Sequence, residues 1–309
     1  MLSSATGRIV KPLSIHTQSP MKSIFTIALL CLFLTAAAQD NSVLVSPEWL
    51  NQHQKDKDVV IVQVNFLKMD YDNEHIEGAR FLWPGWLSPD SPNGSMELPE
   101  VSKAAESLGQ MGISNQSHVV LYYVRNEVSP TTRMFLVMEY LGLSGKVSVL
   151  NGGIEAWKKA GYPVTKEVPV VKKTSFKPSV NPVIVDRNYV LNHLKSEGTV
   201  VVDARAARFY DGEPTGNPRD GHIAGAKNIP YQEMVDQNNM FKPADQLQTY
   251  FTPVVNKNQE AITYCFIGQT ASVVYFAGRM LGYNMKLYDG SMQEWSRIPD
   301  LPMEKSPGK

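Results

Sequence analysis

A single cysteine lies where a short apolar strand gives way to a helix. Residues 261–264 are apolar and β-prone, which predicts a buried strand, and an apolar helix is expected from about Thr270 to Leu281. Cys265 opens the loop between them, and Gly268 lies in the middle of that loop. A thiol in this place faces a helix N-terminus and loop N–H groups, which both favour the thiolate. The pattern indicates a nucleophilic sulfur in an anion-binding loop, with an inert buried cysteine as the competing interpretation.

The chain has one other cysteine, Cys31, in a segment that resembles a secretory signal peptide. Between Met21 and Ala38 the sequence has a lysine, a short apolar run and a small-residue end. Cleavage after Ala38 would leave Cys265 as the sole thiol, so no intramolecular disulfide is possible. We therefore expect residues 1–38 to be a signal peptide with an upstream extension, and the chain to be exported to the periplasm. The apolar run is too short for a stable membrane anchor.

The composition limits the classes of function. With 309 residues the chain is long enough for about two domains. Its 30 basic and 30 acidic residues give a formal net charge of zero, which argues against nucleic acid or an anionic membrane surface as the main partner. No spacing of His, Cys and carboxylate residues indicates a metal site, and we expect no cofactor.

Two halves of the chain repeat the same motifs in the same order. The repeated pairs are an H-I-x-G-A motif at His75 and His222, a β-branched strand at 59–65 and 199–205, a Leu-Gly pair at 141–142 and 281–282, and a Gly-to-Trp spacing in 151–157 and 289–295. Each half alternates short β-branched runs with helical stretches. This alternation predicts an α/β fold in which each half is a parallel sheet flanked by helices on both faces.

The positions of several elements can be predicted directly. The strands of the second half are expected near 199–204, 227–229, 261–264 and 285–288. Helices should open the two halves at 47–52 and 186–196, with Ser46 and Asp186 as N-caps. The stretch between the halves is rich in Lys, Val, Pro and Ser and predicts an extended linker.

Taken together, these motifs resemble the rhodanese superfamily. They are the tandem H-I-x-G-A motifs, a D-A-R strand end at Asp203, a C-x-x-G-x-T loop at Cys265 and a D-G-S…W segment at Asp289. Within that superfamily the chain is similar to the two-domain thiosulfate/3-mercaptopyruvate sulfurtransferases. The resemblance implies an N-terminal rhodanese-like domain at 43–164, a linker at 165–181 and a C-terminal rhodanese-like domain at 182–301.

The resemblance also implies the chemistry of Cys265. This residue would take a sulfane sulfur from a donor such as thiosulfate or 3-mercaptopyruvate, become a persulfide, and pass the sulfur to a thiol or cyanide acceptor. The acceptor thiol could belong to a protein. The persulfide would be cradled by the loop residues Phe266, Ile267, Gly268, Gln269 and Thr270. Gly268 would let the loop curl without a Cβ clash, and Thr270 can cap the following helix.

Three charged residues join the predicted site. Arg208 stands where the resemblance implies an arginine that holds the anionic end of the donor through bidentate bonds. Arg219 resembles a second donor-binding arginine, and Asp203 is expected to support the loop from the neighbouring strand end. A surface or purely structural role is the competing interpretation for each of them.

The first half carries no cysteine and should be catalytically silent. Aligning the two Leu-Gly pairs places Val124 and Arg125 where Tyr264 and Cys265 fall. The first half is then expected to close one side of the active-site cleft. Its aromatic tract at 81–86 is a candidate for part of the cleft wall.

Two alternative functions have to be considered, and the donor has to be identified. A cysteine phosphatase of related fold needs a C-x5-R loop, but Ala271 stands six residues after Cys265, which argues against that activity. A non-catalytic persulfide carrier or binding module fits the same residues as an enzyme. Phe266 and Ile267 match neither the basic residues of thiosulfate-preferring relatives nor the small ones of mercaptopyruvate-preferring relatives. The sequence therefore leaves the donor unnamed.

Overall fold

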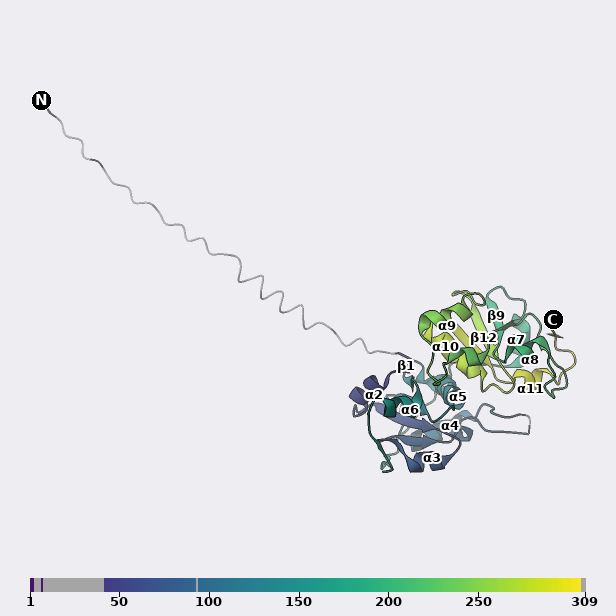
Figure 1. Ribbon diagram of the computed structural model, residues 1–309, viewed down its shortest axis with the longest axis horizontal. Helices are drawn as coiled ribbons and strands as arrows, with labels where there is room; N and C mark the ends of the chain where they lie inside the picture. Colours follow the sequence, from purple (N-terminus) through teal and green to yellow (C-terminus); the bar gives the residue numbers. More distant parts are fainter. Residues whose placement is uncertain (3–6, 8–41, 93, 307–309) are drawn as a thin grey trace. The chain divides into compact units, whose positions relative to one another are not determined.

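Helices and strands alternate along the chain from Leu44 onward in the computed structural model (Figure 1). The structure describes residues 1–2, 7, 42–92 and 94–306, so the predicted signal peptide between Met21 and Ala38 lies outside the described residues. The residues from Asn41 onward group as one compact unit. Within the described residues, no helix has the length and apolar character needed to cross a membrane.

The first half is built on a five-stranded sheet in which every neighbouring pair of strands is parallel. In spatial order its strands are β1 (Leu44–Val45), β6 (Val147–Leu150), β5 (His118–Tyr123), β2 (Val59–Val64) and β4 (Arg80–Leu82). Its helices are α2 (Pro47–His53), α3 (Lys68–Asn73), the 3-10 helix η2 (Pro84–Trp86), α4 (Val101–Gln110), α5 (Val128–Met138), the π-helix η3 (Glu139–Leu143) and α6 (Gly153–Lys159). A short antiparallel pair, β3 (His75–Ile76) and β7 (Val164–Thr165), completes it.

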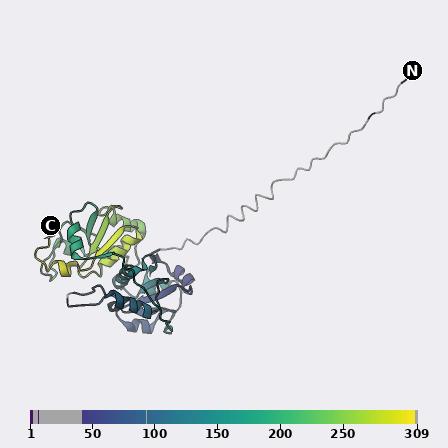
Figure 2. The same ribbon diagram turned by 180° about the vertical axis from the view of Figure 1, so that it is seen from behind.

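The second half repeats this arrangement strand for strand. Figure 2 shows the same ribbon from behind, with the second half in green to yellow. The strands that correspond in order to those of the first sheet are β8 (Ile184–Val185), β13 (Asn284–Tyr288), β12 (Glu260–Tyr264), β9 (Thr199–Asp203) and β11 (Lys227–Asn228). The helices are α7 (Arg187–His193), α8 (Ala207–Asp211), the 3-10 helix η4 (Tyr231–Met234), α9 (Ala244–Phe251), α10 (Ala271–Met280) and α11 (Ser291–Trp295). The antiparallel pair here is β10 (His222–Ile223) with β14 (Met303–Glu304).

The predicted fold class is therefore confirmed, and the predicted strands of the second half agree with the observed ones to within one residue at each end. Ser46 and Asp186 are N-caps: their side chains accept the N–H of Trp49 at 3.2 Å and of Tyr189 at 2.8 Å. The helix expected over 186–196 ends earlier, at His193. The exact domain limits stay a prediction.

The linker has no helix or strand between residues 166 and 181, as expected. It nevertheless follows the first half closely, because the Thr174 N–H donates to the Gly109 carbonyl at 2.9 Å and the Ser179 N–H to the Leu141 carbonyl at 3.0 Å. Phe176 is buried and belongs to the hydrophobic core. The linker is thus part of the packed structure of the first half.

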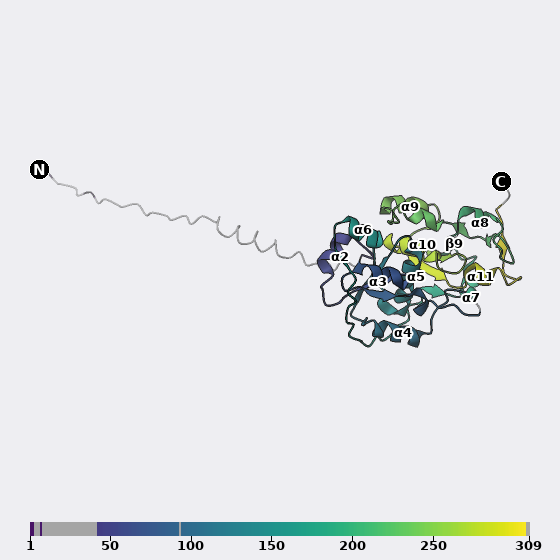
Figure 3. The same ribbon diagram turned by 60° about the horizontal axis from the view of Figure 1, so that its bottom comes forward.

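Helices cover both faces of each sheet, and the largest core lies between the two halves (Figure 3). Helices α5 and α10 pack against each other there, and the rings of Phe135 and Phe276 meet edge to face with centroids 4.8 Å apart. Smaller cores on the outer faces hold Trp157 of α6 and Trp295 of α11. The apolar helix that follows Cys265 is therefore buried between layers, which its sequence predicted.

The repeated H-I-x-G-A motifs have matching structural roles. The ring of His75 stacks on Tyr71 with centroids 4.0 Å apart, and the ring of His222 stacks on Tyr210 at 3.8 Å. Each histidine Nδ1 lies 2.7 Å from the carbonyl oxygen of the tyrosine on which it stacks. The half without a thiol has the same His–Tyr arrangement, so we assign these histidines a structural role and not a catalytic one.

The sheet register corrects the alignment of the two halves. Gln63 faces Tyr122 across β2 and β5, and Asp203 faces Tyr264 across β9 and β12. The counterpart of Cys265 is therefore Tyr123, and the expectation that Arg125 falls there was wrong. The error arose because the first half has two more residues between this strand end and the Leu-Gly pair, and its helix α5 continues into the π-helix η3, which contains the pair.

Candidate functional site

Cys265 follows directly on β12, at the carboxyl end of a central strand of the second sheet. Its side chain is only 1% exposed, and it is the one free cysteine among the described residues. Its N–H donates to Ser291 Oγ at 3.2 Å, and its carbonyl accepts the Met292 N–H at 3.0 Å. The next carbonyl, of Phe266, accepts the Gln293 N–H at 2.9 Å. The first turn of α11 therefore fixes the backbone at the sulfur.

The loop after Cys265 presents a row of free N–H groups. The N–H groups of residues 266–270 form no hydrogen bond with any residue that the structure describes. The loop leads into α10, whose N-terminal end adds the positive end of a helix dipole. Unpaired N–H donors cost free energy when they are left unused, and they are ready to bind an anion. This geometry is the one that the sequence predicted for a thiolate or persulfide.

The structure agrees with the role expected for Gly268 but not with the role expected for Thr270. Gly268 has φ +81°, in the left-handed region that favours glycine. Thr270 occupies the N-cap position of α10, but its backbone is in the helical region and its side chain forms no capping hydrogen bond. The capping role for Thr270 was wrong, because an N-cap side chain reaches the helix N–H groups from an extended backbone.

We expect Gly268→Ala to lower both stability and turnover. A Cβ at this position would lie 3.1 Å from the Asp289 carbonyl oxygen and 3.3 Å from Arg133 Nη1, and the positive φ adds strain. The free energy of unfolding should fall by about 1–2 kcal/mol, and the displaced loop should lower kcat.

Gly282→Ala is the matched control for this substitution. Gly282 also has positive φ, +73°, but a Cβ there would meet no atom within 4 Å. Chemical denaturation and steady-state kinetics of both variants separate backbone strain from the effect on the loop. Equal kinetics in the two variants would contradict a role for the shape of the Gly268 turn.

Asp203 reaches the cysteine loop through Arg205. The Asp203 carboxylate binds Arg205 Nε at 3.0 Å and Nη2 at 2.6 Å, and both side chains are fully buried. The guanidinium carbon lies 5.0 Å from the ring centroid of Phe266. Burial lowers the pKa of Arg205, but the hydrogen bond and charge of Asp203 outweigh burial and raise it, with smaller contributions of the same sign from Tyr264 and Cys265. A buried cation is therefore held close to the sulfur.

Arg208 lies on α8 at the surface beside the loop. Its guanidinium carbon is 4.5 Å from the ring centroid of Phe209, and that ring meets Phe266 edge to face at 5.3 Å. Among the described residues its only ion pair is a long contact of 3.7 Å with Glu213. Most of its hydrogen-bonding capacity is therefore free for an anionic donor, as the donor-binding hypothesis requires.

Arg219 does not fit its expected role. Its guanidinium donates to backbone carbonyls of a single segment, at Trp295, Ser296, Ile298, Pro299 and Leu301. These bonds use all the N–H groups that an arginine possesses. Arg219 therefore ties down the turn after α11, and the structure does not support a donor-binding role for it.

The first half holds the cysteine loop from its own side. Arg133 of α5 binds Asp289 Oδ1 at 2.6 Å, and Gly268 lies against both residues. Gln269 Nε2 donates to Ser129 Oγ at 3.1 Å, and Gln293 bonds to the backbone of Ser95 on both its amide oxygen and nitrogen. The first half thus holds the loop and its supporting segment from one side.

The match to known proteins covers both halves. Residues 46–160 and 186–298 each match the rhodanese-like domain. The chain belongs to the rhodanese-like domain family. It contains two such domains in tandem, which confirms the family resemblance of its motifs.

Relatives of known name share this tandem arrangement over most of their length. The sulfur carrier protein TtuD of Thermus thermophilus is 31% identical over 279 residues, covering 85% of this chain and 96% of the relative. A putative thiosulfate sulfurtransferase of Synechococcus elongatus is 30% identical over 290 residues, covering 89% of each chain. The crystal structure of SseA from Escherichia coli, a 3-mercaptopyruvate sulfotransferase with the rhodanese fold, superposes with a TM-score of 0.72 at 28% identity, covering 81% of this chain and 98% of that one.

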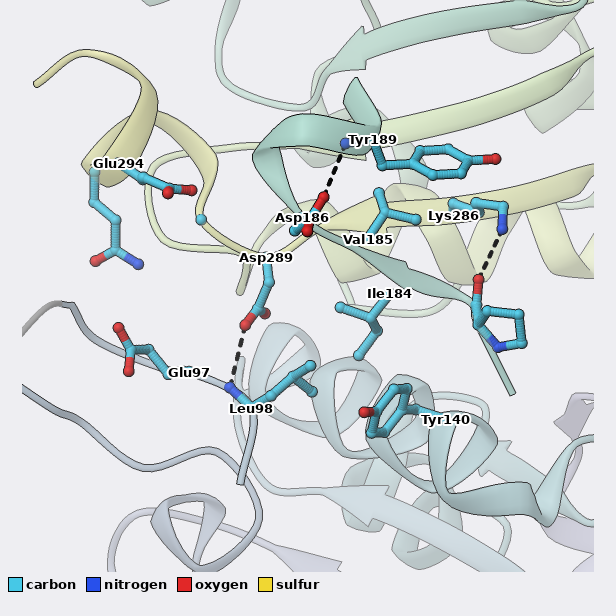
Figure 4. A pocket seen from close by; sticks show the side chains of 13 residues that line it. Glu97, Leu98, Tyr140, Ile184, Val185, Asp186, Tyr189, Lys286, Asp289 and Glu294 are labelled. Carbon is cyan, nitrogen blue, oxygen red and sulfur yellow. Dashed lines mark hydrogen bonds between the residues drawn. The ribbon is translucent and has the colours of Figure 1, made fainter. Parts of the chain in front are cut away.

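A cavity of about 750 Å³ lies between the two rhodanese-like domains, next to the segment that supports the loop (Figure 4). Asp289 and Gln293 line it, and Asp289 Oδ2 accepts the Leu98 N–H there at 3.1 Å. Carboxylates outnumber the single cation, Lys286, and none of the described loop residues 265–270 reaches its wall. It is therefore not suited to an anionic donor and is distinct from the cysteine loop.

The aromatic tract of the first rhodanese-like domain lies beside another cavity. Phe81 and Trp86 line a different cavity, whose described wall comes entirely from residues 68–171. β4 is the edge strand of the first sheet, and neither Phe81 nor Trp86 lines the cavity beside the cysteine loop's supporting segment, so a role of this tract in the cleft wall stays a prediction. Among the described residues, no group of three or more His, Cys, Asp or Glu side chains could hold a metal ion.

Three residues of the site escaped the sequence analysis. Ser291 stands in the D-G-S segment, and its φ of 47° marks a strained backbone that aims Oγ at the Cys265 N–H. Arg205 is the third residue of the D-A-R motif, and its place two residues after Asp203 was a signal that could have identified it. Arg133 had none, because its partner Asp289 is 156 residues away in the sequence.

Proposed function

We propose that this chain is a two-domain sulfurtransferase that carries the transferred sulfur as a persulfide on Cys265. Sulfurtransferase activity agrees with the tandem rhodanese-like domains and with relatives named for it. The observation that carries the assignment to Cys265 is the loop itself, in which the thiol is followed by N–H groups without partners in the described chain. Such a loop stabilises negative charge on sulfur before and after transfer.

The proposed reaction has two steps at one atom. In the first, the Cys265 thiolate attacks the sulfane sulfur of the donor, and the donor's bond to that sulfur breaks. The leaving group departs with the electron pair of the broken bond, as sulfite from thiosulfate or as the pyruvate enolate from 3-mercaptopyruvate. In the second, an acceptor thiolate or cyanide attacks the outer sulfur of the persulfide and regenerates the thiolate. The free N–H groups of the loop and the buried Arg205 favour the anionic sulfur throughout.

The donor is the open part of this proposal. Phe266 and Ile267 put two apolar residues in the loop directly after Cys265, while Arg208 offers one exposed guanidinium. Because Arg205 is already paired with Asp203, one exposed cation and two apolar loop residues suit a singly charged donor with a carbon body better than a compact dianion. We therefore propose 3-mercaptopyruvate, or a similar mercapto acid, in preference to thiosulfate. Comparing kcat/KM for the two donors with one acceptor tests this, and a preference for thiosulfate contradicts it.

Arg208→Ala should raise the KM for an anionic donor by about tenfold and leave kcat nearly unchanged. A hydrogen bond to a charged group contributes about 1.5–3 kcal/mol, and a contact of equal strength in ground and transition states changes KM alone. Steady-state kinetics with a single acceptor measures both constants. Arg187→Ala removes another half-exposed arginine of the same domain and is the control. A fall in kcat with unchanged KM would show that Arg208 does not bind the donor.

A persulfide carrier that passes sulfur to a protein thiol is the second candidate. The relative named as a sulfur carrier favours it. The two functions differ in turnover. An enzyme releases product continuously with excess donor and dithiol, whereas a carrier stops after one sulfur per chain until its partner is added. No cofactor is needed in either case.

We also propose that the chain is exported to the periplasm after cleavage behind Ala38. The apolar run and small-residue end of residues 21–38 support this. N-terminal sequencing of the protein recovered from a cell fraction tests it, with Gln39 as the expected first residue. A mature chain that keeps residues 21–38 contradicts the proposal.

A further inference from the structure

A second cavity, of about 560 Å³, lies in the first rhodanese-like domain. It is bounded by α3, the edge strand β4, η2, the end of α4 and the linker. Its wall includes one arginine, Arg80, and several aromatic or apolar side chains, namely Tyr71, Phe81, Trp86, Met111 and Val168. Since its described wall comes from residues 68–171 alone, it does not belong to the cysteine site.

Arg80 is the unusual residue of this cavity. Its guanidinium forms no hydrogen bond or ion pair with any described residue, and its Nη1 is buried without a partner. Arg133 and Arg205, the other arginines with a buried unpartnered Nη1, both pair with a carboxylate through their remaining nitrogens. Burial lowers the pKa of Arg80, a smaller interaction with the Tyr71 hydroxyl raises it, and no carboxylate lines the described wall around it. A half-buried cation without a counter-ion destabilises a fold, and an anionic ligand at Arg80 would remove that cost.

The remaining wall is aromatic and apolar. The Phe81 ring lies edge to face with Trp86 at 6.0 Å and tilted against Tyr71 at 5.8 Å. Trp86 is 47% exposed, and Val168 of the linker leaves 63% of its surface in contact with solvent. Among the described lining residues the only other charge is that of Lys68, which pairs with Asp72. No carboxylate of the described chain lines the cavity.

We propose that this cavity binds a small carboxylic acid with an aromatic or branched apolar body, whose carboxylate pairs with Arg80. The planar guanidinium matches a carboxylate in a bidentate bond, and the Nε and Nη2 atoms of Arg80 have no competing partner. The aromatic rings and the linker valine take the apolar body, in a volume typical of small-molecule sites. A single free guanidinium fits one negative charge, which favours a carboxylate over a phosphate. The site is independent of the sulfur chemistry.

Isothermal titration calorimetry of the full chain with 4-phenylbutyrate tests this proposal. We expect saturable binding of one molecule per chain, at least tenfold weaker in Arg80→Gln, because a charge-assisted pair is lost. The neutral isostere 4-phenylbutyramide should bind at least tenfold more weakly to the unaltered protein. Absence of saturable binding overturns the proposal, as does equal binding by Arg80→Gln. Binding of peptides with an aromatic C-terminus but not of the small acid would likewise overturn it, in favour of a protein partner.

Two control variants separate this site from others. Arg125→Gln removes an exposed arginine of the same domain that does not line the cavity, and it should bind the acid normally. Cys265→Ser should also bind normally, so that failure of the sulfur chemistry and failure of this site are distinguishable.

Stability gives a second readout. Arg80→Met should leave the thermal midpoint unchanged or raise it, because an unpaired buried charge is removed. Turnover of Arg80→Met without the acid should equal that of the unaltered protein. A clear fall in the midpoint would show that Arg80 stabilises the fold and would overturn the proposal.

Discussion

Cys265→Ser is expected to abolish sulfur transfer without unfolding the protein. Loss of a catalytic nucleophile lowers kcat by roughly a thousandfold or more. Serine is slightly smaller than cysteine and fills almost the same space, so the buried site should lose only about 1 kcal/mol of stability. Turnover with an excess of donor and dithiol measures the loss, and circular dichroism with a thermal scan checks the fold.

Mass spectrometry adds a direct test of the intermediate. Treatment of the unaltered protein with donor should add one sulfur atom per chain, and the same treatment should leave Cys265→Ser unchanged. Cys265 is the only cysteine in the described chain, so the site of addition is unambiguous there. Turnover by the serine variant at a rate near that of the unaltered protein would falsify the mechanism.

Arg133→Met is expected to lower stability and activity together. Arg133 is fully buried, binds Asp289 Oδ1 at 2.6 Å, and also donates to Ser88 Oγ at 2.9 Å and to the Met96 carbonyl at 2.6 Å. Removing one partner of a buried ion pair leaves an uncompensated charge, and the expected loss is about 3–5 kcal/mol of unfolding free energy. Denaturant unfolding measures it. Because Gly268 lies against Arg133 Nη1, kcat should fall as well.

Arg125→Met is the matched control for this prediction. The Arg125–Asp70 pair has the same length, 2.6 Å, but the arginine is 60% exposed. Exposed ion pairs contribute about 0–1 kcal/mol, so the loss of unfolding free energy should be several times smaller in Arg125→Met than in Arg133→Met. A double-mutant cycle of Arg133→Met with Asp289→Asn then isolates their coupling. Similar losses for the two arginines would contradict the view that the first domain anchors the loop.

Both predictions depend on an unequal division of work between the duplicated domains. In the first domain, Tyr123 stands in the position of Cys265 and donates its hydroxyl to the Asn239 carbonyl at 2.5 Å. Gly153 corresponds to Ser291, and a Cβ at Gly153 would lie 2.3 Å from the Tyr123 carbonyl oxygen. The position that carries the thiol in one domain is therefore a packing contact in the other. The first domain instead contributes Arg133, Ser129 and Ser95, which hold the loop of its neighbour and the segment that supports it.

The sequence by itself determined the duplicated α/β architecture, the N-caps Ser46 and Asp186, and the place of Cys265 at the end of a buried strand. These features depend on residues a few positions apart, so periodicity, capping chemistry and the order of motifs are enough to find them. The buried character of the helix after the loop followed from its composition in the same way.

Only the tertiary structure decided which partner each charged side chain has. Arg208 and Arg219 look alike in the sequence, yet one is exposed beside the loop while the other is bound to carbonyls some 76 to 82 residues away. Arg133 and Arg80 show the same contrast, since one finds Asp289 across the chain and the other has no counter-ion in its surroundings. The physical reason is that a guanidinium is satisfied by whatever oxygen the packing of distant segments brings to it, and no local pattern records that choice.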